Sequence, residues 1–137
     1  MKDKVFLDTN IFVYTQSSVE IKKRGVSTNI IENYDCHTST QVLNEVSNVM
    51  FKKLKMQTSE VKQIITAIKI NCKISIISYD MVQMALDLKD RYGYSYYDSL
   101  ILVAGLESGC QKLFSEDMSD GQIIESTLKI INPFKEV

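Results

Sequence analysis

Short strand-like runs alternate with longer stretches of helical periodicity along this chain of 137 residues. Residues 5–7, 74–78, 112–115 and 128–131 form short apolar or β-branched runs, and 35–38 is a further strand candidate. Between these runs, apolar residues recur at three- and four-residue spacing, the pattern of amphipathic helices. Strands that alternate with helices form a parallel sheet covered on both faces. The pattern therefore predicts an α/β fold with a central parallel sheet of four to five strands.

Recognisable start and stop residues bound the expected helices. Ser95 can cap a helix that is apolar on nearly all sides and must therefore be buried, and Gly93 lies where the preceding helix would end. Ser17 or Ser18 is a possible N-cap of an earlier helix, and residues 8–10 are expected to form a turn after the first strand. We expect helical segments at 21–34, 42–54, 61–68, 81–92 and 100–104.

The composition fits one domain that spans residues 1–137. Hydrophobic residues make up 45% and charged residues 24%, so the chain can bury a core. The longest apolar run, Leu100–Leu106, is too short to cross a membrane, and no signal peptide is visible. Three widely spaced cysteines indicate reduced thiols and a cytoplasmic location. The net charge of -1 points to no particular partner.

Four acidic residues from distant parts of the sequence are expected at one edge of the sheet. Asp8 follows the first strand, and Asp117 follows the strand through Phe114. Asp98 lies in the first turn of the buried helix, and Glu45 lies about one turn into its own helix. Right-handed crossovers place all strand ends and helix starts along the same edge, so these four carboxylates converge.

Each acid alone has a structural explanation, as a turn former or a helix-start residue. Together they repel one another: carboxylates about 6 Å apart cost roughly 2–3 kcal/mol per pair at an effective dielectric near 20. Either some of them are protonated or a cation neutralises them. A hard divalent ion with oxygen ligands, Mg²⁺ or Mn²⁺, fits such a site.

Other polar residues around these acids have weaker signals. Asn10 and Ser115 could orient the acids or act only in turns, and Glu116 and Asp120 compete with Asp117 as the last ligand. Asp117 is preferred because the Ser115-x-Asp117 spacing puts both side chains on one side. The single histidine, His37, is interpreted as structural, so a zinc site has little support.

Lysines are concentrated in one stretch of the chain, where Glu60 is the only acid between Lys52 and Lys73. A solvated helical face explains them, but they could also hold the phosphate backbone of RNA. Lys52, Lys53 and Lys55 are the candidates for this role.

Four groups of residues occur in a familiar order. They are Leu7-Asp8-Thr9-Asn10, Glu45 on an early helix, Tyr97-Asp98 at the start of the apolar helix, and Phe114-Ser115-Glu116-Asp117-Met118 after a late strand. This ordered set resembles the PIN domain over nearly the whole chain, and within that family it is most similar to the VapC-type toxin ribonucleases of toxin–antitoxin pairs.

The resemblance implies a Rossmann-like three-layer α/β/α fold, a homodimer, and a small antitoxin that blocks the site. It also implies hydrolysis of RNA with Mg²⁺ or Mn²⁺. By position, Asp8, Glu45, Asp98 and Asp117 are the implied catalytic residues and metal ligands. Asn10 and Ser115 match the polar accessory positions, and Glu116 matches an acid beside the fourth ligand.

The resulting hypothesis is a metal-dependent endoribonuclease, and two other classes stay open. The chain could be a phosphohydrolase with Asp8 as the nucleophile, although such an enzyme would want a second acid where this sequence has Asn10. It could also be a non-catalytic module whose acids hold a metal or receive an arginine from a partner.

Overall fold

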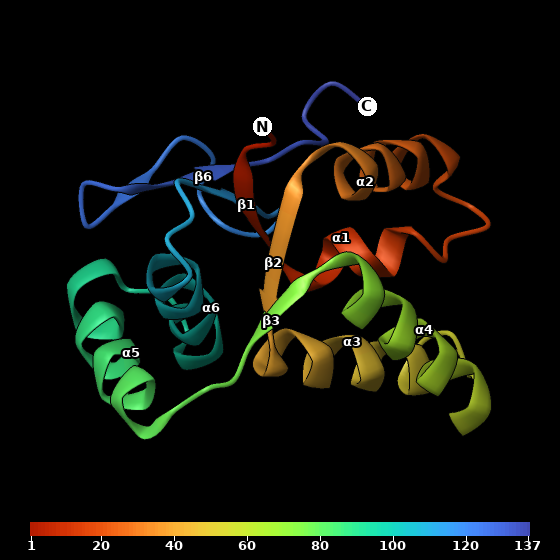
Figure 1. Cartoon of the computed structure of the whole chain (residues 1–137), viewed down its shortest axis with the longest axis horizontal. Coiled ribbons are helices and arrows are strands. Elements are labelled where there is room, and N and C mark those ends of the chain that lie inside the picture. Colours follow the sequence, from red (N-terminus) through yellow and green to blue (C-terminus); the bar gives the residue numbers. More distant parts are fainter.

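The central element of the structure is a short buried strand, β1 (Lys4–Leu7), with helices on both sides of the sheet that it anchors (Figure 1). The computed structural model describes all residues, 1–137. The sheet has six strands in the order β3-β2-β1-β4-β6-β5. The other strands are β2 (Asp35–Ser39), β3 (Lys73–Ser75), β4 (Lys112–Phe114), β5 (Ile123–Ile124) and β6 (Leu128–Ile131).

The order of the strands reverses at β1. From β1 the chain continues through β2 to β3 on one side, and β4 and β6 later add to the other side. These five strands are parallel, as predicted, whereas the two-residue strand β5 pairs antiparallel with β6. Leu7 pairs with Phe114, so β1 and β4 end side by side at this switch point. Ligand sites of open α/β sheets lie at such positions.

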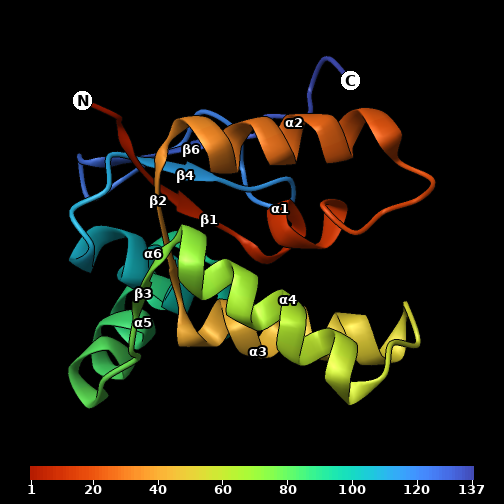
Figure 2. The same cartoon turned by 45° about the vertical axis from the view of Figure 1, so that its right-hand side comes forward.

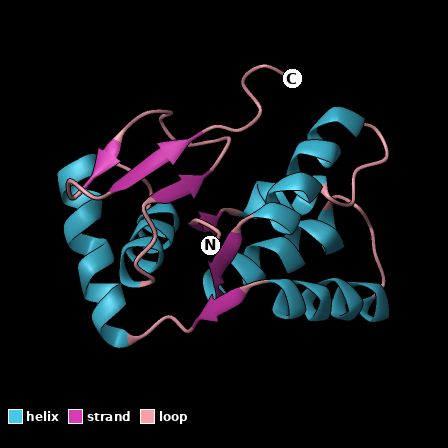
Figure 3. Ribbon diagram, turned by 45° about the horizontal axis from the view of Figure 1, so that its top comes forward, coloured by secondary structure: helices cyan, strands magenta, loops and turns pink.

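Helices cover both faces of the sheet, which confirms the predicted three-layer arrangement (Figure 2). On one face, Gly105 approaches Phe6 and Leu128 closely. On the other face, Tyr34 packs edge-on against Phe114 at a ring distance of 5.4 Å. Figure 3 shows helices on two sides of the strands. The helices are α1 (Thr9–Tyr14), α2 (Ile21–Asn33), α3 (Thr40–Lys52), α4 (Thr58–Asn71), α5 (Tyr79–Tyr92) and α6 (Tyr96–Glu107).

Helix α6 forms the centre of the apolar core. It packs between the sheet and α5, so residues 99–105 are all buried, as its all-round apolar sequence predicts. Ser95 caps its start, and Gly93 ends α5 with a left-handed backbone (φ 79°), both as predicted. No helix combines the length and the apolar character that crossing a membrane requires.

The structure corrects two local predictions and adds one short strand. Residues 8–10 do not form an open turn, because Asp8 caps the short helix α1. Ser17 accepts hydrogen bonds from two backbone N–H groups ahead of α2, whose N-cap residue is Glu20. Strand β5 was not predicted, since two residues carry no measurable periodicity.

The contact of α6 with the sheet can be tested by changing glycine to valine at two separate positions, one packed and one open. In Gly105→Val, the added carbon would lie 3.0 Å from Leu128 Cδ2, so we expect the free energy of unfolding to fall by about 1–3 kcal/mol. Gly25 lies in α2 with open space around it, so Gly25→Val should change stability by less than about 0.5 kcal/mol. Urea unfolding of both variants measures the difference, and equal losses would contradict this packing.

Candidate functional site

Asp8 is the buried centre of the candidate site. It follows β1, and only 4% of its surface is exposed. Its Oδ1 accepts a hydrogen bond from the Thr9 backbone N–H (2.6 Å), and its Oδ2 accepts one from the Ser115 hydroxyl (2.6 Å). Both carboxylate oxygens therefore have donors, which fixes the orientation of the group.

Asp117 is held beside this centre by the loop that follows β4. Its backbone N–H donates to Ser115 Oγ (3.3 Å), and its Oδ2 accepts a hydrogen bond from Asn10 Nδ2 (3.0 Å). Ser115 is fully buried and contacts both Asp8 and the Asp117 backbone. Asn10 and Ser115 thus form hydrogen bonds that hold Asp117 and Asp8 in place.

Asp98 and Glu45 approach the same region from two helices. Asp98 lies in the first turn of α6, where its backbone N–H is capped by Ser95 Oγ (3.1 Å). Glu45 lies on α3, and Gln41 Nε2 contacts its Oε2 at 3.4 Å. Both side chains are half-buried. The charges of Asp98 and Asp117 act on both Asp8 and Glu45, so the four predicted acids lie near one another at one end of the sheet.

The charges of these acids influence one another. Burial raises the pKa of Asp8 to about 6 against the hydrogen bonds from Ser115 and Thr9, and the charges of Asp98 and Asp117 raise it further. Burial also raises the pKa of Glu45 to about 7, with added repulsion from Asp8 first and then from Asp98 and Asp117. The pKa of Asp98 is raised by burial and by Asp117. The site thus carries more negative charge than its surroundings neutralise.

The donor set fits a hard cation in its chemistry. All four side chains offer carboxylate oxygens, which favour a hard cation over a soft one. The excess of negative charge favours a divalent cation over a monovalent one. Their spacing is open, because no three acidic, histidine or cysteine side chains are gathered closely enough to hold one ion.

Glu116 is turned away from this group of acids, although it is the neighbour of Asp117. Its carboxylate forms an ion pair with Lys23 Nζ at 2.6 Å and accepts a hydrogen bond from the Tyr14 hydroxyl. Lys23 also lies over the Tyr14 ring, 4.9 Å from its centre. These contacts hold the pKa of Glu116 below its usual range despite partial burial.

The sequence did not predict the ion pair of Lys23 with Glu116 or the hydrogen bond from Tyr14 to Glu116. Lys23 lies 93 positions before Glu116, and no local pattern links the two residues. Asp120, the other competing acid, accepts hydrogen bonds from the Asn132 backbone (2.7 Å) and Lys135 (3.2 Å). Neither acid replaces Asp117 beside Asp8.

The remaining candidates lie outside this group. Lys52, Lys53 and Lys55 are exposed at and after the end of α3, with Lys52 roughly 10 Å along the helix axis beyond Glu45. His37 is buried in β2, with Nε2 3.4 Å from Asp35 Oδ1, which agrees with a structural role.

The sequence matches the model of the PIN domain family over residues 5–119. No match is found among curated protein sequences.

Solved structures with the same fold include several toxins and their complexes. VapC20 of Mycobacterium tuberculosis, described as a sarcin–ricin loop cleaving toxin, is 17% identical with a TM-score of 0.69. The match covers 88% of this chain and 97% of VapC20. A toxin–antitoxin complex from Klebsiella pneumoniae is 18% identical with a TM-score of 0.70, covering 95% of this chain and 98% of that one. VapBC2 from Rickettsia felis, bound to a promoter DNA fragment, is 16% identical with a TM-score of 0.65, covering 94% and 99%.

The raised pKa of Asp8 predicts a specific pH dependence of stability. Its pKa is 3.8 in the unfolded chain and about 6 in the folded one, so the folded state binds the proton more tightly between these values. The stabilisation that Asp8 contributes as a neutral acid is therefore lost as the pH rises. In the absence of metal, wild type should lose roughly 2 kcal/mol relative to Asp8→Asn between pH 4.5 and 7.5.

Urea unfolding in EDTA at both pH values measures this difference. Asp90→Asn, at an exposed position on α5, is the matched control and should follow wild type at both pH values. A difference between wild type and Asp8→Asn that does not change with pH would contradict the burial of the Asp8 charge.

Proposed function

The chain belongs to the PIN domain family, and on this premise we propose that it is a metal-dependent endoribonuclease of the VapC toxin type. One observation carries the proposal: four carboxylates from distant segments lie at the ends of β1 and β4, on α3 and at the start of α6, where the charges of Asp98 and Asp117 raise the pKa values of both Asp8 and Glu45. Four acids at a switch point, without a nucleotide-binding loop, are suited to metal-assisted phosphodiester hydrolysis.

The proposed metal ligands are Asp8, Asp98 and Asp117, with Glu45 binding directly or through a water molecule. A bound Mg²⁺ or Mn²⁺ would activate water and stabilise the charge that develops on the leaving oxygen. Because the spacing of the acids is open, we expect the side chains of Asp98 and Glu45, which lie on two separate helices, to adjust around the ion.

The neighbouring residues prepare the carboxylates for this role. Ser115 and the Thr9 backbone N–H hold Asp8 in one orientation, so little ordering remains to be done when an ion binds. Asn10 does the same for Asp117. Lys23 and Tyr14 keep Glu116 out of the group, which limits the number of negative charges there.

The substrate of this proposal is single-stranded or looped RNA. Lys52, Lys53 and Lys55 are proposed to contact its phosphate groups beyond the acids, since exposed lysines bind a polyanion without reading its sequence.

The proposed partners follow from the structural neighbours. The Klebsiella complex contains an antitoxin, and VapBC2 was solved as a complex bound to DNA. We propose that this chain is likewise inhibited by a small antitoxin protein, forms a homodimer, and acts in the cytoplasm.

RNA cleavage is the direct test of the proposed activity. Wild type should cleave RNA with Mg²⁺ or Mn²⁺ and lose the activity in EDTA. Asp8→Asn should lower the rate by about 10²-fold or more, because it removes a charge that the ion requires, whereas Asp90→Asn should retain it. Equal cleavage under all of these conditions would refute the proposal.

Two other outcomes would assign the chain to the alternative classes. A phosphoryl group trapped on Asp8 would identify a phosphohydrolase. A melting temperature that rises with Mg²⁺ while RNA stays intact would identify a non-catalytic metal-binding module.

The choice between the adjacent acids Asp117 and Glu116 has its own test. Asp117→Asn should abolish the rise in melting temperature that Mn²⁺ gives wild type, because it removes a proposed ligand. Glu116→Gln should keep that rise, since the Glu116 carboxylate is engaged with Lys23 and Tyr14. Thermal unfolding with and without Mn²⁺ compares the two variants, and the reverse result would make Glu116 the ligand.

A further inference from the structure

Two buried cysteines lie beside each other, Cys36 in β2 and Cys72 directly before β3. In the parallel pairing of β2 with β3, His37 is opposite Lys73, so the preceding residues Cys36 and Cys72 are also opposite each other. Cys72 has an extended backbone (φ -132°, ψ 149°), which continues the line of β3. Neighbouring strands are about 4.8 Å apart, within the Cα–Cα range of a disulfide.

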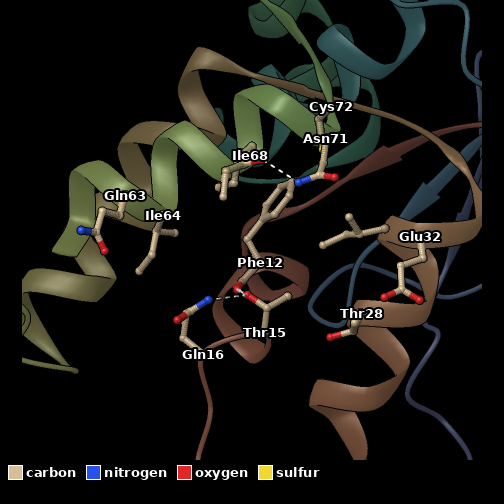
Figure 4. Close-up of a pocket in the computed structure, with 12 residues that line it drawn as sticks. Phe12, Thr15, Gln16, Thr28, Glu32, Gln63, Ile64, Ile68, Asn71 and Cys72 are labelled. Atoms are coloured by element: carbon tan, nitrogen blue, oxygen red, sulfur yellow. Dashed lines mark hydrogen bonds between the residues drawn. The ribbon is translucent and has the colours of Figure 1, made fainter.

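The two side chains are on the same face of the sheet. The Cys36 thiol lies 3.6 Å from the Ile30 carbonyl and 3.5 Å from the Tyr34 carbonyl, so it points toward α2. Cys72 lines a cavity of about 390 Å³ between α1, α2 and α4, together with Ile31 of α2. Figure 4 shows Cys72 at one end of this cavity, beside Asn71.

The strand register and the shared face bring the two thiols together, and the thiols differ in acidity. A hydrogen bond from Cys72 lowers the pKa of Cys36, while the same contact and burial raise the pKa of Cys72. Cys36 is therefore the more acidic thiol of the pair. Both are free cysteines in the structure.

The third cysteine does not belong to this pair. Cys110 precedes β4, and β1 lies between β4 and β2. Two strand spacings, roughly 9–10 Å, separate Cys110 from Cys36, which is beyond the reach of a disulfide.

We propose that Cys36 and Cys72 form a reversible oxidation site, in which a small peroxide that enters the cavity converts the two thiols into a disulfide. One of the two sulfur atoms attacks a peroxide oxygen, the O–O bond breaks, and the leaving hydroxide takes a proton to become water. The other sulfur atom then gives up its proton, attacks the resulting sulfenic acid and releases a second water. Together the two thiols lose two electrons and two protons, and one peroxide accepts them to become two water molecules.

The disulfide would join the end of α4 to β2 and enclose α3 and α4 in one loop. Cross-linking a loop of this length restricts the unfolded chain, so the oxidised protein should be the more stable form. Because Cys72 lines the cavity, the bond would also fix one end of that cavity.

Mass spectrometry of the full chain tests the proposal. The folded protein is treated with hydrogen peroxide in EDTA, unfolded, and alkylated with iodoacetamide. We expect alkylation at Cys110 alone and a linked peptide pair that contains Cys36 and Cys72. Dithiothreitol should restore alkylation at all three cysteines. Alkylation of all three after peroxide, a sulfinic acid at Cys36, or a disulfide to Cys110 would overturn the proposal.

Thermal unfolding provides a second measurement. Peroxide should raise the melting temperature by roughly 5–10 °C, and dithiothreitol should reverse the rise. Cys72→Ser should abolish the rise and Cys110→Ser should keep it. Peptide mapping of the wild type decides the pairing even where a variant fails to fold.

Discussion

The candidate site depends on the parallel pairing of β1 with β4 at the centre of the sheet. Because Leu7 is in register with Phe114, the residues that follow, Asp8 and Ser115, leave the two strands side by side and form a hydrogen bond of 2.6 Å. The Asp8 backbone N–H continues the ladder by donating to the Phe114 carbonyl (3.1 Å). The sheet thus keeps the Asp8 carboxylate in a place where burial, and to a smaller extent the charges of Asp98 and Asp117, oppose its ionisation.

Contacts from α1 and α2 give the two neighbouring acids at the end of β4 different surroundings. Asp117 and Glu116 are consecutive, yet Asn10 of α1 binds the first, while Tyr14 of α1 and Lys23 of α2 bind the second. One acid is therefore added to the group and the next is neutralised outside it. The carboxylates that stay in the group still repel one another, and a bound cation would relieve that repulsion.

The short helix α1 connects the acids with the cavity. Its capping residue is Asp8, and its other end supplies Phe12 and Thr15 to the cavity wall, where α4 contributes Cys72 at its end. Helix α1 thus contacts both the proposed metal site and the cavity beside the proposed disulfide site. The first site offers hard oxygen ligands and the second a pair of sulfur atoms.

The sequence by itself determined the parallel sheet and the buried helix α6, and it predicted Asp8, Glu45, Asp98 and Asp117 at one edge of that sheet. Strand and helix periodicity is local, and the handedness of crossovers then fixes which ends meet. Only the tertiary structure decided that Lys23 holds Glu116 away, that Cys36 lies opposite Cys72, and that residues 8–10 begin a helix. These features arise from strand register and from contacts between residues far apart in the chain, and no spacing along the sequence encodes such contacts.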